Sequence, residues 1–140
     1  MKKTKLKRKS KSEHRQLMDA LWDMCKQIVS MVYGEDCYTC PAKNLVGRNK
    51  HLGHVPWPES TMSALLKRDI RVLRYQCYRC NIHHGGMGGV AYKKMLREEG
   101  APFMEQLEKE KNNNTTKADD HYRKLIKEYT EQFPELFTGN

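Results

Sequence analysis

The sequence lacks two features of membrane and secreted proteins: an apolar run long enough to cross a membrane, and the apolar segment of a signal peptide after its basic start. Apolar residues make up 38% of the 140 residues and aromatic residues 9%, which predicts one domain with a modest core. Acidic residues are also scarce, at 17 against 26 lysines and arginines, and the net charge is +9. We therefore expect a cytoplasmic protein with no membrane partner and with a polyanion as its partner.

Four of the five cysteines form two pairs with the same spacing, Cys37-Tyr-Thr-Cys40 and Cys77-Tyr-Arg-Cys80. Each pair places two thiolates on one tight turn, which is half of a tetrahedral Cys₄ zinc site. Since sulfur then fills every coordination position, the predicted Zn²⁺ is structural. The fifth cysteine, Cys25, falls within an apolar helical pattern and is expected to be a small buried hydrophobe. A thioredoxin-like redox motif is disfavoured because no βαβ pattern surrounds either pair.

The chain divides by composition into four parts. Residues 1–12 form a cationic arm, and 13–34 form a helix that Ser12 caps and Gly34 ends. Residues 35–100 form the zinc-stabilised module, which glycines and prolines interrupt, and 101–140 form C-terminal helices. Because the apolar face of the first helix is broad, we expect it to pack in the core or to form a homodimer.

Smaller elements follow from local patterns. We expect a short β-hairpin within residues 45–55, a helical turn over 63–67, and a helix over 90–99 that Gly100 ends. A second helix should begin near Pro102 and run to Lys111. The last helix should be capped by Thr116 or Asp119 and ended by Pro134.

Polar side chains suited to catalysis gather around the cysteine pairs, at His51, His54, Asn81, His83 and His84. Phosphodiester hydrolysis needs a base that activates water and a hard cation that stabilises the phosphate. His54 has the character of such a base, because the preceding Gly53 allows close backbone approach. Asn81 offers an oxygen directly after Cys80, although the amide could instead cap the following turn. His83 and His84 open a glycine-rich turn, where either could meet a cation or a phosphate.

Basic residues are the candidate phosphate contacts. In the module they could equally form a solvated face, and in the arm a solubilising tail. These residues are Arg68, Arg71, Arg74, Arg79, Lys7, Arg8 and Lys9.

The order of motifs resembles a known family. Cys37-x-x-Cys40, Gly53-His54, Gln76-Cys77-x-x-Cys80-Asn81, a glycine-rich turn and Tyr92-x-x-x-Leu96 are similar to the phage NinG recombination proteins. More broadly they resemble HNH (ββα-metal) endonucleases with a treble-clef zinc site and phage junction-resolving endonucleases. The similarity covers about residues 36–100.

The resemblance implies an α+β fold, with a small treble-clef or ββα-metal module flanked by N- and C-terminal helices. It implies a phage-encoded DNA endonuclease that processes recombination intermediates or branched DNA in a bacterial host. His54 would be the general base on the second strand of the ββα unit. Asn81 and a residue between His83 and Gly89 would hold Mg²⁺ or Mn²⁺.

Two departures from the family pattern concern the cation. Many HNH enzymes carry Asp before the catalytic histidine, where this chain has Gly53, and the turn after His84 has glycines in place of a Gly-Asn pair. His51 lies two residues before Gly53, on the same face of a regular strand, and could replace the missing carboxylate. His83 or His84 could replace the missing Asn. The alternative is a non-catalytic zinc module that binds DNA in recombination or transcription, and a weaker one is an RNA-binding zinc protein.

Overall fold

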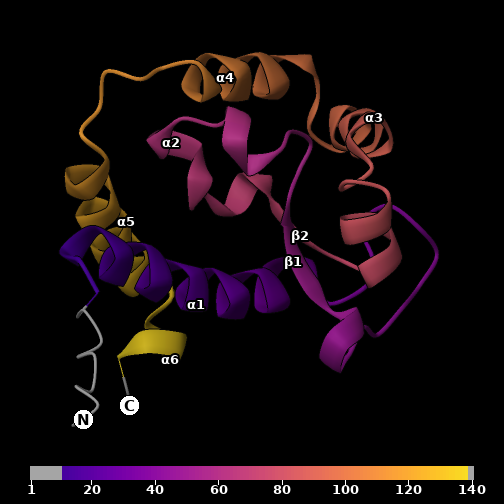
Figure 1. Ribbon diagram of the computed structural model, residues 1–140, viewed down its shortest axis with the longest axis horizontal. Helices are drawn as coiled ribbons and strands as arrows, with labels where there is room; N and C mark the ends of the chain where they lie inside the picture. The colour runs from indigo at the N-terminus through magenta and orange to yellow at the C-terminus, as the bar shows by residue number, and fades with distance from the viewer. Residues whose placement is uncertain (1–10, 139–140) are drawn as a thin grey trace, which may run out of the picture.

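The computed structural model describes residues 11–138, so the expected contacts of Lys7, Arg8 and Lys9 lie outside the described residues. The fold is α+β, with helices around one two-stranded sheet (Figure 1). In chain order the elements are α1 (Glu13–Tyr33), η1 (Gly47–Asn49), β1 (His51–His54), η2 (Glu59–Thr61), α2 (Ala64–Lys67), η3 (Ile70–Val72), β2 (Leu73–Gln76), η4 (Arg79–His83), α3 (Gly88–Glu99), α4 (Ala101–Lys111), α5 (Ala118–Gln132) and α6 (Pro134–Phe137).

The ends of α1 confirm the sequence prediction. Ser12 is the N-cap, and its hydroxyl accepts a hydrogen bond of 3.2 Å from the Arg15 amide. At the other end Gly34 adopts φ 81°, a left-handed conformation that side chains disfavour, and its amide bonds back to the carbonyls of Val29 and Ser30. The chain can therefore turn sharply from α1 into the first cysteine pair.

The sheet differs from the expected hairpin. Residues 47–49 form the helical turn η1, and β1 pairs antiparallel with β2, in the register His51↔Gln76 to His54↔Leu73. The 18 residues between the strands hold η2, α2 and η3. His54 is thus on the first strand of the sheet rather than the second, and the helix α3 follows β2 after η4.

Two clusters of buried side chains make up the core. One lies between α1, α5 and the sheet, and includes Leu21, Ile28 and Tyr122. The other lies between α2, α3 and α4, and includes Leu66 and Met95. In Figure 1, α4 and α1 run along opposite sides of the molecule, with α2 between them.

The apolar face of α1 is mostly used inside the chain. Its residues Leu21, Cys25, Ile28 and Val29 are fully buried against α5 and β2. Exposed large apolar side chains of α1 remain only at its last turn within the described chain, at Met31, Val32 and Tyr33. Packing within the core therefore accounts for the helix, and a homodimer through α1 stays a prediction. No helix between residues 11 and 138 has the length and apolar character that a membrane crossing requires.

Candidate functional site

The two cysteine pairs converge on one point. The sulfur atoms of Cys37, Cys40, Cys77 and Cys80 all lie within 4.8 Å of one another, and the Sγ atoms of Cys40 and Cys77 are 3.7 Å apart. Tetrahedral Zn–S bonds of about 2.3 Å place ligand sulfurs about 3.8 Å apart. A disulfide would need about 2.05 Å. The cluster therefore has the donors and the spacing to hold a metal ion such as zinc.

Backbone hydrogen bonds fix the cysteines to the sheet. The Tyr38 amide donates to the Tyr75 carbonyl of β2 over 2.9 Å, which ties the first pair to the strand that leads into the second. Beyond Cys80, the Gly86 amide donates to the Cys80 carbonyl over 2.8 Å. The end of α1, the sheet and the glycine-rich turn thus meet around the four sulfurs.

His54 ends β1 with its ring enclosed. The imidazole stacks on Trp22 of α1, with ring centroids 5.6 Å apart, and Nε2 lies 2.8 Å from the Lys67 carbonyl oxygen. A carbonyl oxygen can only accept a hydrogen bond, so Nε2 carries the proton and Nδ1 has the free lone pair. Nδ1 lies 3.8 Å from a carboxylate oxygen of Glu59.

Burial keeps this imidazole neutral. The side chain of His54 is only 8% exposed. Burial lowers its pKa, and this outweighs the Lys67 carbonyl and Glu59, which favour the charged form. Because the ordinary value is about 6.5, His54 is mainly neutral at pH 7 and able to accept a proton.

A polar cleft of about 460 Å³ adjoins the stacked pair. It carries three cations and two carboxylates, and three of its residues, Trp22, Glu59 and Lys67, contact His54 directly. Its lining residues are Arg15, Met18, Asp19, Trp22, Glu59, Lys67 and Arg68.

Asn81 faces the other side of the same strand. A Cβ atom built on Gly53 would lie 2.7 Å from Asn81 Oδ1, so the amide oxygen rests against the Gly53 backbone. Side chains of neighbouring strand residues point to opposite faces. The structure therefore does not place Asn81 on the face of the sheet that carries the His54 ring.

His83 and His84 lie away from both residues. Both are exposed; His84 Nε2 accepts a hydrogen bond of 3.3 Å from Arg79, and the His83 ring meets the edge of Tyr78 at 5.3 Å. In the described chain, no hydrogen bond or ring contact joins either histidine to His54 or Asn81. The expected pairing of His84 with His54 in one site is not observed.

His51 also turns elsewhere. Its Nε2 lies 2.8 Å from the Arg48 carbonyl, and its ring contacts Tyr78 at 5.5 Å. These contacts do not place it where the missing carboxylate was expected. We call the exposed group Tyr78, Arg79, His83 and His84, with His51 beside it, the Tyr78 patch.

Two of the arginines predicted to contact phosphate are buried, which corrects that prediction and the alternative of a solvated arginine face. Arg68 and Arg74 are 8% and 5% exposed. Arg68 donates to the carbonyls of Met18 and Lys67 and pairs with Glu59 at 3.2 Å. Arg74 donates to three carbonyls in residues 70–73, and its guanidinium stacks over Tyr33 at 3.4 Å. Carbonyl oxygens of the same chain, together with a carboxylate for Arg68 and an aromatic ring for Arg74, therefore already bind both guanidinium groups.

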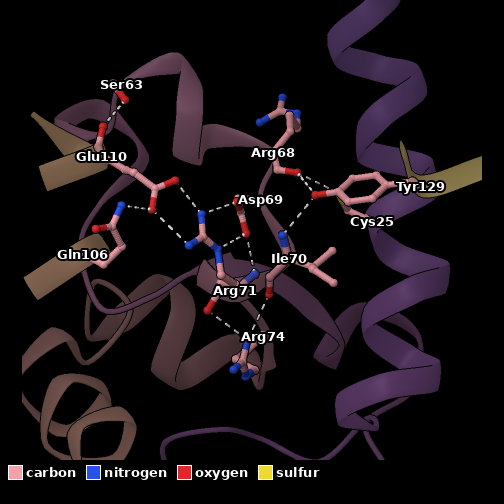
Figure 2. Close-up of polar contacts among 10 residues, drawn as sticks. All are labelled: Cys25, Ser63, Arg68, Asp69, Ile70, Arg71, Arg74, Gln106, Glu110 and Tyr129. Atoms are coloured by element: carbon pink, nitrogen blue, oxygen red, sulfur yellow. Dashed lines mark hydrogen bonds and ion pairs between the residues drawn. The ribbon is translucent and has the colours of Figure 1, made fainter. Parts of the chain in front are cut away.

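Arg71 is also used internally. Figure 2 shows its guanidinium between Asp69 and Glu110, with contacts of 2.7 Å to each carboxylate. This ion pair fastens α4 to the segment before β2. Of the four arginines expected to contact phosphate, only Arg79 is exposed.

The sequence interpretation gave no role to Gln76, which proves central to the Asn81 side of the sheet. Its side chain is fully buried, and Oε1 has no hydrogen-bond partner in the described structure. In the sequence, its place directly before Cys77 was the available signal, whereas the burial of the whole strand arises only on folding.

Scans against protein-family models, curated proteins and solved structures give no match for the chain. The resemblance to NinG and HNH proteins therefore stays a prediction.

Proposed function

We propose that this chain is a zinc-stabilised DNA endonuclease that depends on a divalent cation, with His54 as its general base. The observation that carries the proposal is the state of His54. A backbone carbonyl holds one ring nitrogen, burial keeps the ring neutral, and the second nitrogen is unprotonated beside a polar cleft. These are the properties that a base needs at neutral pH.

In the proposed reaction, Nδ1 of His54 takes a proton from a water molecule as that water attacks the phosphorus atom. The bond from phosphorus to the leaving oxygen then breaks, and that oxygen takes a proton from solvent. Lys67 and Arg15, which line the cleft, supply positive charge for the phosphate. A bound Mg²⁺ or Mn²⁺ would stabilise negative charge on the phosphate and the leaving oxygen.

The four cysteines would hold Zn²⁺ in a structural role. Four thiolates complete a tetrahedral shell, so no position remains for water or substrate. In this proposal the metal fixes β2 and the glycine-rich turn, and takes no part in hydrolysis.

The net charge of +9 and the Tyr78 patch support DNA as the substrate. Tyr78 is 45% exposed and has Arg79 beside it, a combination that suits stacking on an unpaired base and contact with phosphate. Branched or recombining DNA of phage origin in a bacterial cytoplasm offers such unpaired bases. This substrate follows from the NinG resemblance and belongs to the proposal.

A cleavage assay tests the function. Purified protein is incubated with supercoiled, linear and branched DNA in Mg²⁺, Mn²⁺ or EDTA. His54→Ala should lower the cleavage rate by about 10²–10⁴-fold, the usual effect of losing a general base. His14→Ala is the matched control, because His14 lies on the exposed start of α1 and pairs with Asp119. Cleavage by His54→Ala at the wild-type rate would remove His54 from this role.

A second function, a non-catalytic zinc module that binds DNA, is favoured by one observation: the His54 ring and Asn81 lie on opposite faces of β1. The same assay separates the two functions. DNA binding without cutting in any metal would support the accessory module and overturn the endonuclease.

A further inference from the structure

A hollow of about 530 Å³ is lined by residues of α1, the sheet and α6. Its apolar lining comes from Leu52 of β1 and Tyr75 of β2, which are paired across the sheet, and from Leu136 of α6. Within residues 11–138 it shares no lining residue with the cleft beside His54. We call it the Tyr75 hollow.

The ring of Tyr75 is held in place on two sides. Its hydroxyl donates to the Lys26 carbonyl over 3.0 Å, which ties the ring to α1. The Lys50 ammonium lies 4.8 Å from the ring centroid, and the residue as a whole is only 5% exposed. The hollow therefore offers apolar surface but no open aromatic face on which a nucleobase could stack.

The rim of the hollow is polar and carries an excess of positive charge. Lys26, Gln27 and Ser30 come from α1, and Lys50 directly precedes β1. The Ser30 hydroxyl donates to Glu35 Oε1 over 2.6 Å, and Lys50 binds the same oxygen, so this carboxylate is already engaged. In the described chain Lys26 pairs with no carboxylate, so two ammonium groups face one carboxylate.

This combination fits an apolar group that carries one negative charge beside it. Sites for small molecules bury about 70–90% of the ligand surface. Lys26 and Gln27 are exposed, so the Tyr75 hollow is open to solvent on its α1 side. A chain end that continues into solvent suits such an open site better than a free small acid does.

We infer that the Tyr75 hollow binds the C-terminus of a partner protein whose last side chain is apolar. That side chain packs on Leu52, Tyr75 and Leu136, and the terminal carboxylate pairs with Lys26. The amide of Gln27 bonds the last peptide group. The inference does not rest on the proposed function, because the partner would leave the cleft beside His54 open.

The first test measures peptide binding to the zinc-loaded chain without DNA, by fluorescence anisotropy. The probe is the peptide Gly-Asp-Gly-Gly-Phe, labelled at its N-terminus and free at its C-terminus. Its C-terminal amide, and a peptide with Gly in place of Phe, should each bind about tenfold more weakly or worse. Equal affinity for the acid and the amide, or for the peptides with and without Phe, would overturn the proposal.

The second test is Lys26→Gln, which removes a charge without breaking an ion pair of the described chain. It should weaken binding of the free-acid peptide about tenfold and leave binding of the amide peptide unchanged. Lys93→Gln is the matched control, because Lys93 is exposed on α3, which contributes no residue to the hollow. An equal loss of affinity in both variants would indicate attraction by net charge alone and overturn the site.

Nuclear magnetic resonance separates the other occupants. The peptide should shift the backbone amide signals of Ser30 and Leu52, whereas thymidine monophosphate at the same concentration should not. Equal shifts with the nucleotide would overturn the proposal, as would 3-phenylpropionate, which lacks the peptide group, binding as tightly as the peptide. A dimer of this chain that the peptide dissociates would assign the hollow to a second copy, against the proposal.

Discussion

Folding moves the imidazole of His54 out of water and against Trp22. Burial lowers the pKa of His54 below the ordinary value of about 6.5. At a pH between the pKa of the folded chain and that of the unfolded chain, His54 is therefore protonated more in the unfolded chain than in the folded one. The contribution of His54 to stability is therefore full above about pH 6.5 and is lost as the pH falls through the lower, folded value. Glu59, Lys67 and Arg68 are the charged groups that act on this ring.

We predict that His54→Phe, which keeps a ring against Trp22 and cannot ionise, weakens this pH dependence. Urea unfolding at pH 5 to 8 would measure the free energy of unfolding of both proteins. As the pH falls below about 6.5, the free energy of unfolding of the wild type should decrease more than that of the variant. Comparing the two proteins cancels the pH dependence of metal binding. A difference that stays constant across the range would contradict the prediction.

Gly53 gives a second prediction at the scale of one residue. In Gly53→Ala the new Cβ would meet two amide oxygens at 2.7 Å, and Gln76 cannot move away without losing its own hydrogen bonds. We expect a loss of about 1–3 kcal/mol, the range for overpacking a tight site. Gly89→Ala is the control: nothing lies within 4 Å of its built Cβ, and helical alanine should be neutral or stabilising. Equal stability of both variants by chemical denaturation would contradict this account.

Among the elements, α5 is joined to the segment between α2 and β2 by one hydroxyl. Tyr129 donates to the Arg68 carbonyl over 2.8 Å and accepts from the Ile70 amide over 3.3 Å, as Figure 2 shows. Tyr129→Phe should lower the free energy of unfolding by about 1–3 kcal/mol, because it leaves buried backbone groups without partners. Tyr92→Phe, on the exposed side of α3, should change it by less than about 0.5 kcal/mol. Thermal or urea unfolding of the two variants measures the contrast.

The sequence was sufficient where a local rule decides an element. Ser12 and Gly34 bound α1 as predicted, and α2 (Ala64–Lys67) lies within the predicted helical turn. Long-range pairing was not accessible, because nothing near His51 or Gln76 indicates that these residues face one another across 25 positions. At the end of the chain the N-cap of α5 is Lys117 rather than Thr116 or Asp119, and Pro134 begins α6 instead of only stopping α5.

The same limit applies to the site. The spacing of Cys37, Cys40, Cys77 and Cys80 predicted the sulfur cluster, because each pair needs only one local turn. The arginines were misjudged because the carbonyls and carboxylates that enclose Arg68 and Arg74 belong to segments brought together only by folding. Gln76 was missed for the same reason.

For the whole molecule, the cysteine cluster borders the larger core, which includes Cys37, Cys77 and Cys80. Structural zinc sites bind with about 10–16 kcal/mol, as much as or more than the total stability of a typical domain. Chelation of the metal, or Cys77→Ser, should therefore unfold the chain at temperatures where the wild type is folded. Circular dichroism and the zinc content per chain measure the two effects.

The control is Cys25→Ala. Cys25 is buried in α1 and belongs to no cluster of metal-binding side chains within residues 11–138. This variant should keep one zinc per chain. A Cys77→Ser protein that retains its melting temperature would contradict a structural role for the metal.

The enclosure of Arg68, Arg71 and Arg74 changes what the net charge of +9 means for a polyanion. When a protein binds DNA, each phosphate that it neutralises releases condensed counterions, and the slope of affinity against salt counts those contacts. Arginines that already pair with carboxylates and carbonyls of the same chain neutralise no phosphate, so they release no counterions from the DNA. The salt dependence of DNA binding should thus report fewer contacts than the basic composition suggests, and it should reflect exposed groups such as Arg79.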